Sequence, residues 1–101
     1  MKPAAFDYVR AESAAEAAHE LQRRGTNARI LAGGQSLMAV LNMRLAQPSA
    51  LIDISRTADL HYARPEGGML EVGAAVTQGQ LEWRDALSSE VPLLAQAIPF
   101  I

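Results

Sequence analysis

The sequence predicts a small α+β domain, close to the α/β class, built as a β-α-β-α-β unit followed by a hairpin and further helices. Three observations predict this fold. Short apolar stretches of strand composition alternate with amphipathic stretches of helical period. Two pairs of residues have the spacing of a capping box at a helix start. Pro-Glu-Gly-Gly at residues 65–68 marks a tight turn. The order of elements leaves open whether parallel and antiparallel strands share one mixed sheet.

The first two predicted elements are a strand and a helix. Residues 6–9 alternate large apolar and polar side chains, as a half-buried strand does. Ser13 stands three residues before Glu16, the spacing at which a hydroxyl and a carboxylate can each accept from a backbone amide at a helix start. Gly25 ends this helix, because glycine adopts the left-handed conformation beyond a helix. The apolar face of this helix consists of Ala14, Ala17, Ala18 and Leu21.

A strand, a glycine turn and a second helix come next. Residues 29–32 have strand composition, residues 33–36 read Gly-Gly-Gln-Ser, and residues 37–44 have helical composition. After the break at Pro48, residues 51–54 predict a third strand. A short helical turn is expected over Thr57 to Leu60. This order places the glycine pair directly after a strand.

The last third predicts a hairpin and two helices. Residues 60–64 and 69–73 are the hairpin strands, joined by the turn at 65–68. Thr77 and Gln80 have capping-box spacing and introduce a helix that reaches about Ala86.

Pro92 opens the final predicted helix, which reaches Ile98, because proline suits a first helical position. The sequence then stops on the apolar residues 99–101, with no cap or turn. We therefore expect residues 1–101 to be one unit, the N-terminal part of a longer, truncated domain.

Composition excludes several classes of protein. The chain is 50% hydrophobic and 20% charged, with a net charge of -2 and no cysteine, which removes thiolate chemistry and cysteine-held metal clusters. The nine basic residues form no stripe, so nucleic acid is not expected as a partner. No apolar run approaches the ~20 residues of a membrane span. The N-terminus has no secretory signal, so we expect a cytoplasmic protein.

Metal and acid-base chemistry have no specific support. Arg23 stands where a zinc-protease helix beginning at His19 needs its second histidine. His61 is interpreted as a surface or turn residue, and Asp53 as a structural carboxylate at a strand end. No side chain is therefore assigned as a catalytic acid, base or nucleophile.

The glycine turn is the most informative segment. Gly33 and Gly34 let a ligand approach the main chain, and successive amide groups before a helix can converge on a diphosphate. Ser36 either caps the helix or binds a phosphate oxygen, and the Gln35 amide adds a donor. A plain strand-to-helix turn is the alternative, and the pattern alone does not decide. The dinucleotide fingerprint is absent, because Leu37 occupies the place of its third glycine.

Small side chains mark a second candidate segment at residues 74–77. They leave room for a flat group, and Thr77 has the chemistry to bind a ligand while capping its helix. The alternative is a cap alone.

The chain resembles the N-terminal part of the FAD-binding medium subunit of molybdenum hydroxylases, the carbon monoxide dehydrogenase and xanthine dehydrogenase family. The resemblance runs from end to end. It is carried by Lys2-Pro3-Ala4-Ala5-Phe6-Asp7-Tyr8, Ala32-Gly33-Gly34-Gln35-Ser36-Leu37, Asn42-Met43-Arg44-Leu45, Leu51-Ile52-Asp53-Ile54, Val72-Gly73-Ala74-Ala75-Val76-Thr77 and Val91-Pro92-Leu93-Leu94.

This resemblance implies a flavin domain of the p-cresol methylhydroxylase type, in an oxidoreductase of several subunits. It implies that electrons pass from molybdopterin on a large subunit, across 2Fe-2S clusters on a small iron-sulfur subunit, to FAD and then to an external acceptor. The cofactor-binding residues that it implies are Ile30, Leu31, Ala32, Gly33, Gly34, Gln35, Ser36, Leu37 and Thr77.

The family continues with a second glycine-rich phosphate loop beyond the residues present here. We therefore expect residues 1–101 alone to bind FAD weakly or not at all. Gly34→Val is expected to abolish cofactor retention by placing a β-branched side chain against the phosphates. Three alternatives stay open: a non-catalytic α/β binding or assembly module, an inert remnant of such a subunit, and a flavin oxidase of the vanillyl-alcohol type that works without molybdenum.

Overall fold

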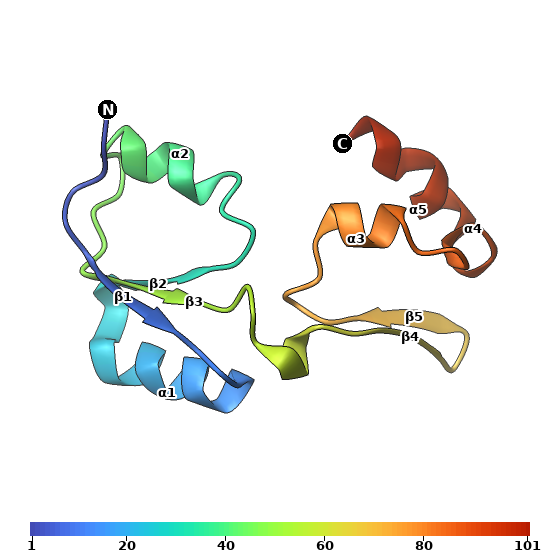
Figure 1. The fold of residues 1–101 in the computed structure, drawn as a ribbon, viewed down its shortest axis with the longest axis horizontal. Helices are drawn as coiled ribbons and strands as arrows, with labels where there is room; N and C mark the ends of the chain where they lie inside the picture. The colour runs from blue at the N-terminus through green and yellow to red at the C-terminus, as the bar shows by residue number, and fades with distance from the viewer.

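The computed structural model describes all residues from 1 to 101, and the chain forms two halves that lie side by side (Figure 1). The first half contains β1 (Asp7–Arg10), α1 (Ala14–Arg24), β2 (Ala28–Leu31), α2 (Leu37–Asn42) and β3 (Ala50–Asp53). The second half contains β4 (Ala63–Glu66), β5 (Met69–Val72), α3 (Gln78–Glu82), α4 (Leu87–Glu90) and α5 (Pro92–Ala97). Short 3-10 turns cover Gly25–Asn27, Ala58–Leu60 and Ile98–Phe100. The predicted α+β class is confirmed, and the predicted strands and helices follow one another in the predicted order.

The first half is a parallel three-stranded sheet between two helices. Its strand order is β1-β3-β2, and α1 and α2 lie on opposite sides of it (Figure 1). All four residues of the central strand β3 are buried, as expected for a parallel strand covered on both faces. The core cluster is rich in alanine, which lets the elements approach closely: Ala11, Ala17, Ala28, Ala50, Ile52 and Ile54.

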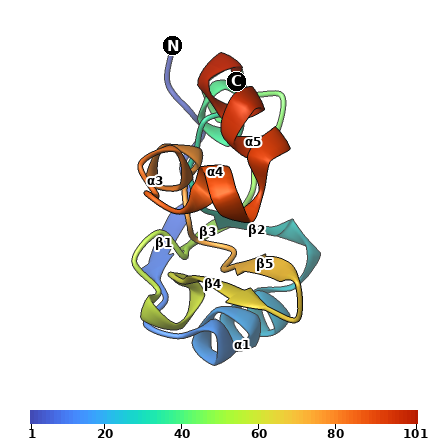
Figure 2. The ribbon, with the colours of Figure 1, turned by 90° about the vertical axis from the view of Figure 1, so that its right-hand side faces the viewer.

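The second half is an antiparallel hairpin with three short helices above it (Figure 2). The hairpin pairs only with itself, so the structure has two sheets and no mixed sheet. Its turn is Gly67-Gly68, with φ of 58° and 80°, the two-residue geometry that matches strand twist. The predicted four-residue turn is therefore wrong for Pro65 and Glu66, which belong to β4.

Helix lengths differ from the prediction at two places. The helix expected over residues 37–44 ends at Asn42, because Arg44 has φ of 55° and leaves the helical region. The helix expected to reach about Ala86 ends at Glu82, and α4 follows as an element that the sequence did not predict. Arg84 donates to both carboxylate oxygens of Glu90, at 2.6 and 2.8 Å, which holds the chain in the turn between these helices.

The cap of α1 joins distant parts of the chain. Ser13 Oγ accepts from the Glu16 amide at 3.0 Å, as predicted. The Glu16 carboxylate instead accepts from the Glu12 amide, so the reciprocal half of the capping box is wrong. Asp59 accepts from the Ala14 amide at 3.0 and 3.1 Å and satisfies another free donor of this helix end. Gly25 ends α1 with φ of 79°, as predicted.

A close backbone contact joins the segment after β5 to the segment that connects the two halves. Gly73 donates to the Tyr62 carbonyl at 2.8 Å, and Ala75 donates to the Leu60 carbonyl at 3.1 Å. A Cβ on Gly73 would lie 2.2 Å from the Leu60 carbonyl oxygen, so no side chain fits there. Residues 73–77 are thereby fixed against the segment that leaves the first half.

No helix is both long and apolar enough to span a membrane.

We predict that Gly73→Ala lowers the free energy of unfolding by about 1–3 kcal/mol, because two backbone segments must move apart to admit the methyl group. Urea unfolding of the purified protein measures this. Gly79→Ala is the control, since its Cβ would meet only Thr77 Oγ1 at 3.9 Å. Equal stability of the two variants would contradict the close contact.

Candidate functional site

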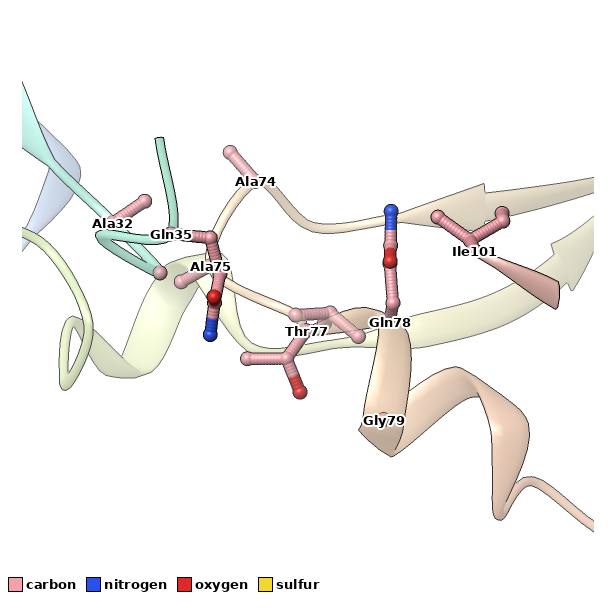
Figure 3. A pocket seen from close by; sticks show the side chains of 10 residues that line it. Ala32, Gln35, Ala74, Ala75, Thr77, Gln78, Gly79 and Ile101 are labelled. Atoms are coloured by element: carbon pink, nitrogen blue, oxygen red, sulfur yellow. The ribbon is translucent and has the colours of Figure 1, made fainter. Parts of the chain in front are cut away.

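A cavity of about 640 Å³ lies between the two halves of the chain. The turn after β2 contributes Ala32, Gly33 and Gln35, the segment after β5 contributes residues 74–79, and Ile101 lines the remaining side (Figure 3). The turn follows the carboxyl end of a parallel strand, where open α/β sheets bind their ligands. The lining contains no charged side chain, so any anion here is met by neutral donors.

The backbone of the glycine turn has a row of free donors. The amide N–H groups of the five consecutive residues from Gly33 to Leu37 donate to no acceptor in the protein. The first amide that bonds again is Met38, which donates to the Gly34 carbonyl at 3.0 Å. Successive unpaired amides in a turn form a concave site for anions. This row can therefore bind the oxygens of a ligand.

The two glycines of the turn are required for different reasons. Gly34 has φ of 78°, and a Cβ there would lie 3.3 Å from Met38 Cγ and 3.4 Å from Leu31 Cδ1. Gly33 has no positive φ, and a Cβ there would meet no protein atom within 4 Å. The turn itself therefore needs glycine only at position 34. A ligand that came close to the main chain would account for glycine at position 33.

This geometry shows that Gly34→Val would act on the turn before it acts on a bound cofactor. The valine side chain would meet Met38 and Leu31, and the backbone would be strained, so the variant disturbs the turn first. A bulky residue at Gly33, which lines the cavity, is the substitution that fills the space beside the amides.

The two hydroxyl residues of the candidate site differ in their role as caps. Ser36 has helical dihedrals and makes no side-chain cap, so capping, one of its two predicted roles, is wrong. Thr77 forms the complete predicted capping box with Gln80, since Thr77 Oγ1 accepts from the Gln80 amide at 3.1 Å and Gln80 Oε1 accepts from the Thr77 amide at 2.9 Å. The Thr77 hydroxyl hydrogen remains available to a ligand.

The structure brings four of the nine predicted site residues onto the cavity wall: Ala32, Gly33, Gln35 and Thr77. Gly34, Ser36 and Leu37 lie in the same turn but do not line the wall, and Ile30 and Leu31 lie within β2. The assignment of all nine residues as cofactor ligands stays a prediction.

Sequence reasoning did not assign Gln78, Gly79 and Ile101, which also line the cavity. The only sequence signal for the first two was their place directly after Thr77.

Two polar residues outside the cavity have structural contacts. Asp53 is 8% exposed and accepts from the Tyr8 hydroxyl and from the Ser55 amide at 2.8 Å. Burial raises the pKa of Asp53, but these hydrogen bonds outweigh it, and the pKa lies below its usual value. His61 Nε2 lies 2.6 Å from the Ser55 carbonyl oxygen, which agrees with a turn residue.

A turn with five unpaired amides lies at the carboxyl end of a parallel sheet, and two of its residues, Gly33 and Gln35, line a cavity without charged side chains. This is an arrangement that can bind a phosphate-bearing ligand. Residues 4–101 match the model of one family, the FAD binding domain in molybdopterin dehydrogenase. The chain belongs to this family, and the family's cofactor is FAD. The resemblance seen in the sequence is confirmed.

Known relatives are similar in sequence over nearly the whole chain. It is 40% identical over 98 residues to caffeine dehydrogenase subunit beta of Pseudomonas sp. (strain CBB1), covering 97% of this chain and 33% of the relative. It is 38% identical over 101 residues to the carbon monoxide dehydrogenase medium chain of Hydrogenophaga pseudoflava, covering 100% of this chain and 35% of the relative. The chain thus spans about a third of the length of these relatives.

Solved structures confirm the fold. Carbon monoxide dehydrogenase from Hydrogenophaga pseudoflava superposes with a TM-score of 0.94 at 38% identity, covering 100% of this chain and 35% of that one. Quinoline 2-oxidoreductase from Pseudomonas putida 86 superposes with a TM-score of 0.91 at 36% identity, covering 97% and 34%.

We predict that Gly34→Ala lowers the free energy of unfolding by about 1 kcal/mol or more, because alanine is strained at positive φ. Gly33→Ala is expected to stay within about 0.5 kcal/mol of the wild type, since its methyl group meets no protein atom. Urea unfolding of both variants measures the difference. A larger loss for Gly33→Ala would mean that the fold itself requires that glycine.

We predict that Tyr8→Phe lowers the melting temperature at pH 7, and that this difference shrinks in acid. The Tyr8 hydrogen bond favours the ionised Asp53, so its stabilisation is present above the usual pKa of an aspartate and is lost as pH falls through the lowered pKa of the folded state. Thermal unfolding of wild type and variant between pH 7 and pH 2 measures this. A difference that grows in acid would contradict the assignment.

Proposed function

We propose that this chain is part of the FAD-binding, electron-transfer subunit of a molybdopterin-dependent dehydrogenase. In this proposal, the turn from Gly33 to Leu37 binds the diphosphate of FAD through its amide groups. The observation that carries the proposal is the row of five amides without a protein acceptor. The fold itself does not require glycine at position 33, because a Cβ there would meet no protein atom within 4 Å.

The residues present fit the cofactor. The amides supply donors for phosphate oxygens, and Gln35, Thr77 and Gln78 supply neutral side-chain donors around the same space. Ala74 and Ala75 present only methyl groups to the cavity, which leaves room for a planar ring system. FAD, when bound, supplies the chemistry of accepting and releasing electrons. The chain contributes binding, orientation and partial shielding from water.

Partner subunits complete the proposed path of electrons. Relatives of this chain carry the names of dehydrogenase subunits, and one solved relative is described as a Cu,Mo-CO dehydrogenase. We infer a large molybdopterin-binding subunit and a small iron-sulfur subunit as partners, in the cytoplasm. The absence of cysteine from this chain agrees with clusters held by another polypeptide.

The alternative of a purely structural turn is less well supported. No side-chain cap or other protein acceptor meets the amides of residues 33–37, so in a purely structural turn they would be left to water. A non-catalytic module gives no reason for a glycine at position 33.

We predict that Gly33→Val lowers FAD affinity by about tenfold or more while leaving the protein folded, because the side chain enters the space beside the amides. The affinity is measured on the protein purified from its native host. Its flavin absorbance is recorded, and the apoprotein is then titrated with FAD. Ala39→Val, at an exposed position on α2 outside the cavity, is the control. Unchanged flavin retention in Gly33→Val would refute the proposed site.

We also predict that residues 1–101 in isolation bind FAD weakly or not at all. One row of amides neutralises a diphosphate, but about two thirds of the length of the relatives has no counterpart here to shield the flavin ring. The absorbance spectrum of the isolated chain tests this, and a stoichiometric flavin band would contradict it.

A further inference from the structure

We propose that Met38, which does not line the cavity, is a positioning residue for the cofactor: its side chain holds Gly34 in the conformation that orients the free amides of the turn. This inference rests on the proposed function, because it takes those amides as the donors to the FAD diphosphate. It also gives Leu31, which the sequence predicted as a cofactor-binding residue, an indirect role through the same glycine.

The conformation of Gly34 depends on its neighbours. A glycine has no side chain to restrict its backbone, and it loses more conformational freedom on folding than any other residue. The φ of 78° at Gly34 must therefore be held from outside the residue. The amides of residues 35–37 follow directly along the chain, so their directions change whenever this φ changes.

Two side chains and one hydrogen bond hold Gly34 in place. A Cβ on Gly34 would lie 3.3 Å from Met38 Cγ and 3.4 Å from Leu31 Cδ1, so these two side chains border the glycine on that side. The Met38 amide donates to the Gly34 carbonyl at 3.0 Å, which closes one helical turn around residues 35–37. Gly34 is thereby held between the end of β2 and the start of α2.

The two side chains that border Gly34 differ in how firmly they are anchored. The Leu31 carbonyl accepts from the Ile54 amide at 2.9 Å, and Leu31 pairs with Asp53 of the central strand β3. Leu31 is therefore fixed to the buried sheet. Met38 is 38% exposed, so its side chain can be shortened with less damage to the fold. A substitution of Met38 keeps its backbone hydrogen bond to Gly34, and so tests the side chain alone.

A second methionine at the other end of the same helix provides the matched control. Met43 is the C-cap residue of α2 and is 58% exposed. It neither borders Gly34 nor lines the cavity. Met43→Ala removes the same side-chain atoms as Met38→Ala, but away from the turn.

The experiment titrates FAD and ADP into the apoproteins of wild type, Met38→Ala, Met38→Leu and Met43→Ala, purified from the native host. Met38→Ala is expected to weaken both ligands by about fivefold, because both carry a diphosphate and the amides are less well oriented before binding. Met38→Leu is expected to restore the affinity, since leucine keeps the Cγ atom that borders Gly34. Met43→Ala is expected to bind both ligands like the wild type.

A double variant tests whether Met38 acts through the amides. Gly33→Val already fills the space beside them, so Met38→Ala added to Gly33→Val is expected to cause little further loss of FAD affinity. A further loss by the full factor would show that Met38 acts independently of the amides, and would overturn its proposed role.

The remaining outcomes separate this inference from the proposed function. Wild-type affinity in Met38→Ala, an equal loss in Met43→Ala, or a loss for FAD without a loss for ADP would overturn the role of Met38 and leave the FAD site intact. A wild-type protein without affinity for FAD would overturn the proposed function itself.

Discussion

The left-handed conformation of Gly34 is the constraint on which the candidate site depends. The chain leaves the buried parallel sheet through β2, and at Gly34 it turns before the short helix α2 begins. In this turn, five amide groups in succession have no partner in the protein. A side-chain cap, which Ser36 does not supply, would satisfy only part of them. The fold therefore leaves unpaired a set of donors that a phosphate-bearing ligand can satisfy.

The second wall of the cavity depends on a different contact. Gly73 brings its backbone against Leu60 and Tyr62, with no room for a side chain, and this fixes the segment that carries Thr77 and Gln78. The first half thus contributes backbone donors and the Gln35 side-chain amide, and the second half contributes the side-chain donors of Thr77 and Gln78. Neither half alone surrounds the cavity. Recognition of an anion without a cationic side chain requires both sets of neutral donors to converge.

Local patterns in the sequence predicted much of this arrangement. The strand before the glycine pair, the cap at Ser13 and the capping box at Thr77 each involve neighbours along the chain, so spacing is sufficient to find them. The family resemblance added the ligand, which the glycine pair alone left undecided.

The remaining features arise from contacts between distant residues. The short helix α4 depends on the Arg84–Glu90 ion pair, and a pattern of apolar residues does not show whether such a pair forms. The separate reasons for Gly33 and Gly34 depend on what a Cβ would meet in space. Gln78 and Ile101 reach the cavity only because the two halves come together. These features required three-dimensional structure.

The most direct measurement of the central claim is a crystal structure of the protein with FAD bound, in the form its host makes. The account predicts diphosphate oxygens at hydrogen-bond distance, about 2.7–3.2 Å, from the amide nitrogens between Gly33 and Leu37. A bound FAD whose diphosphate lies elsewhere, with these amides facing water, would contradict it.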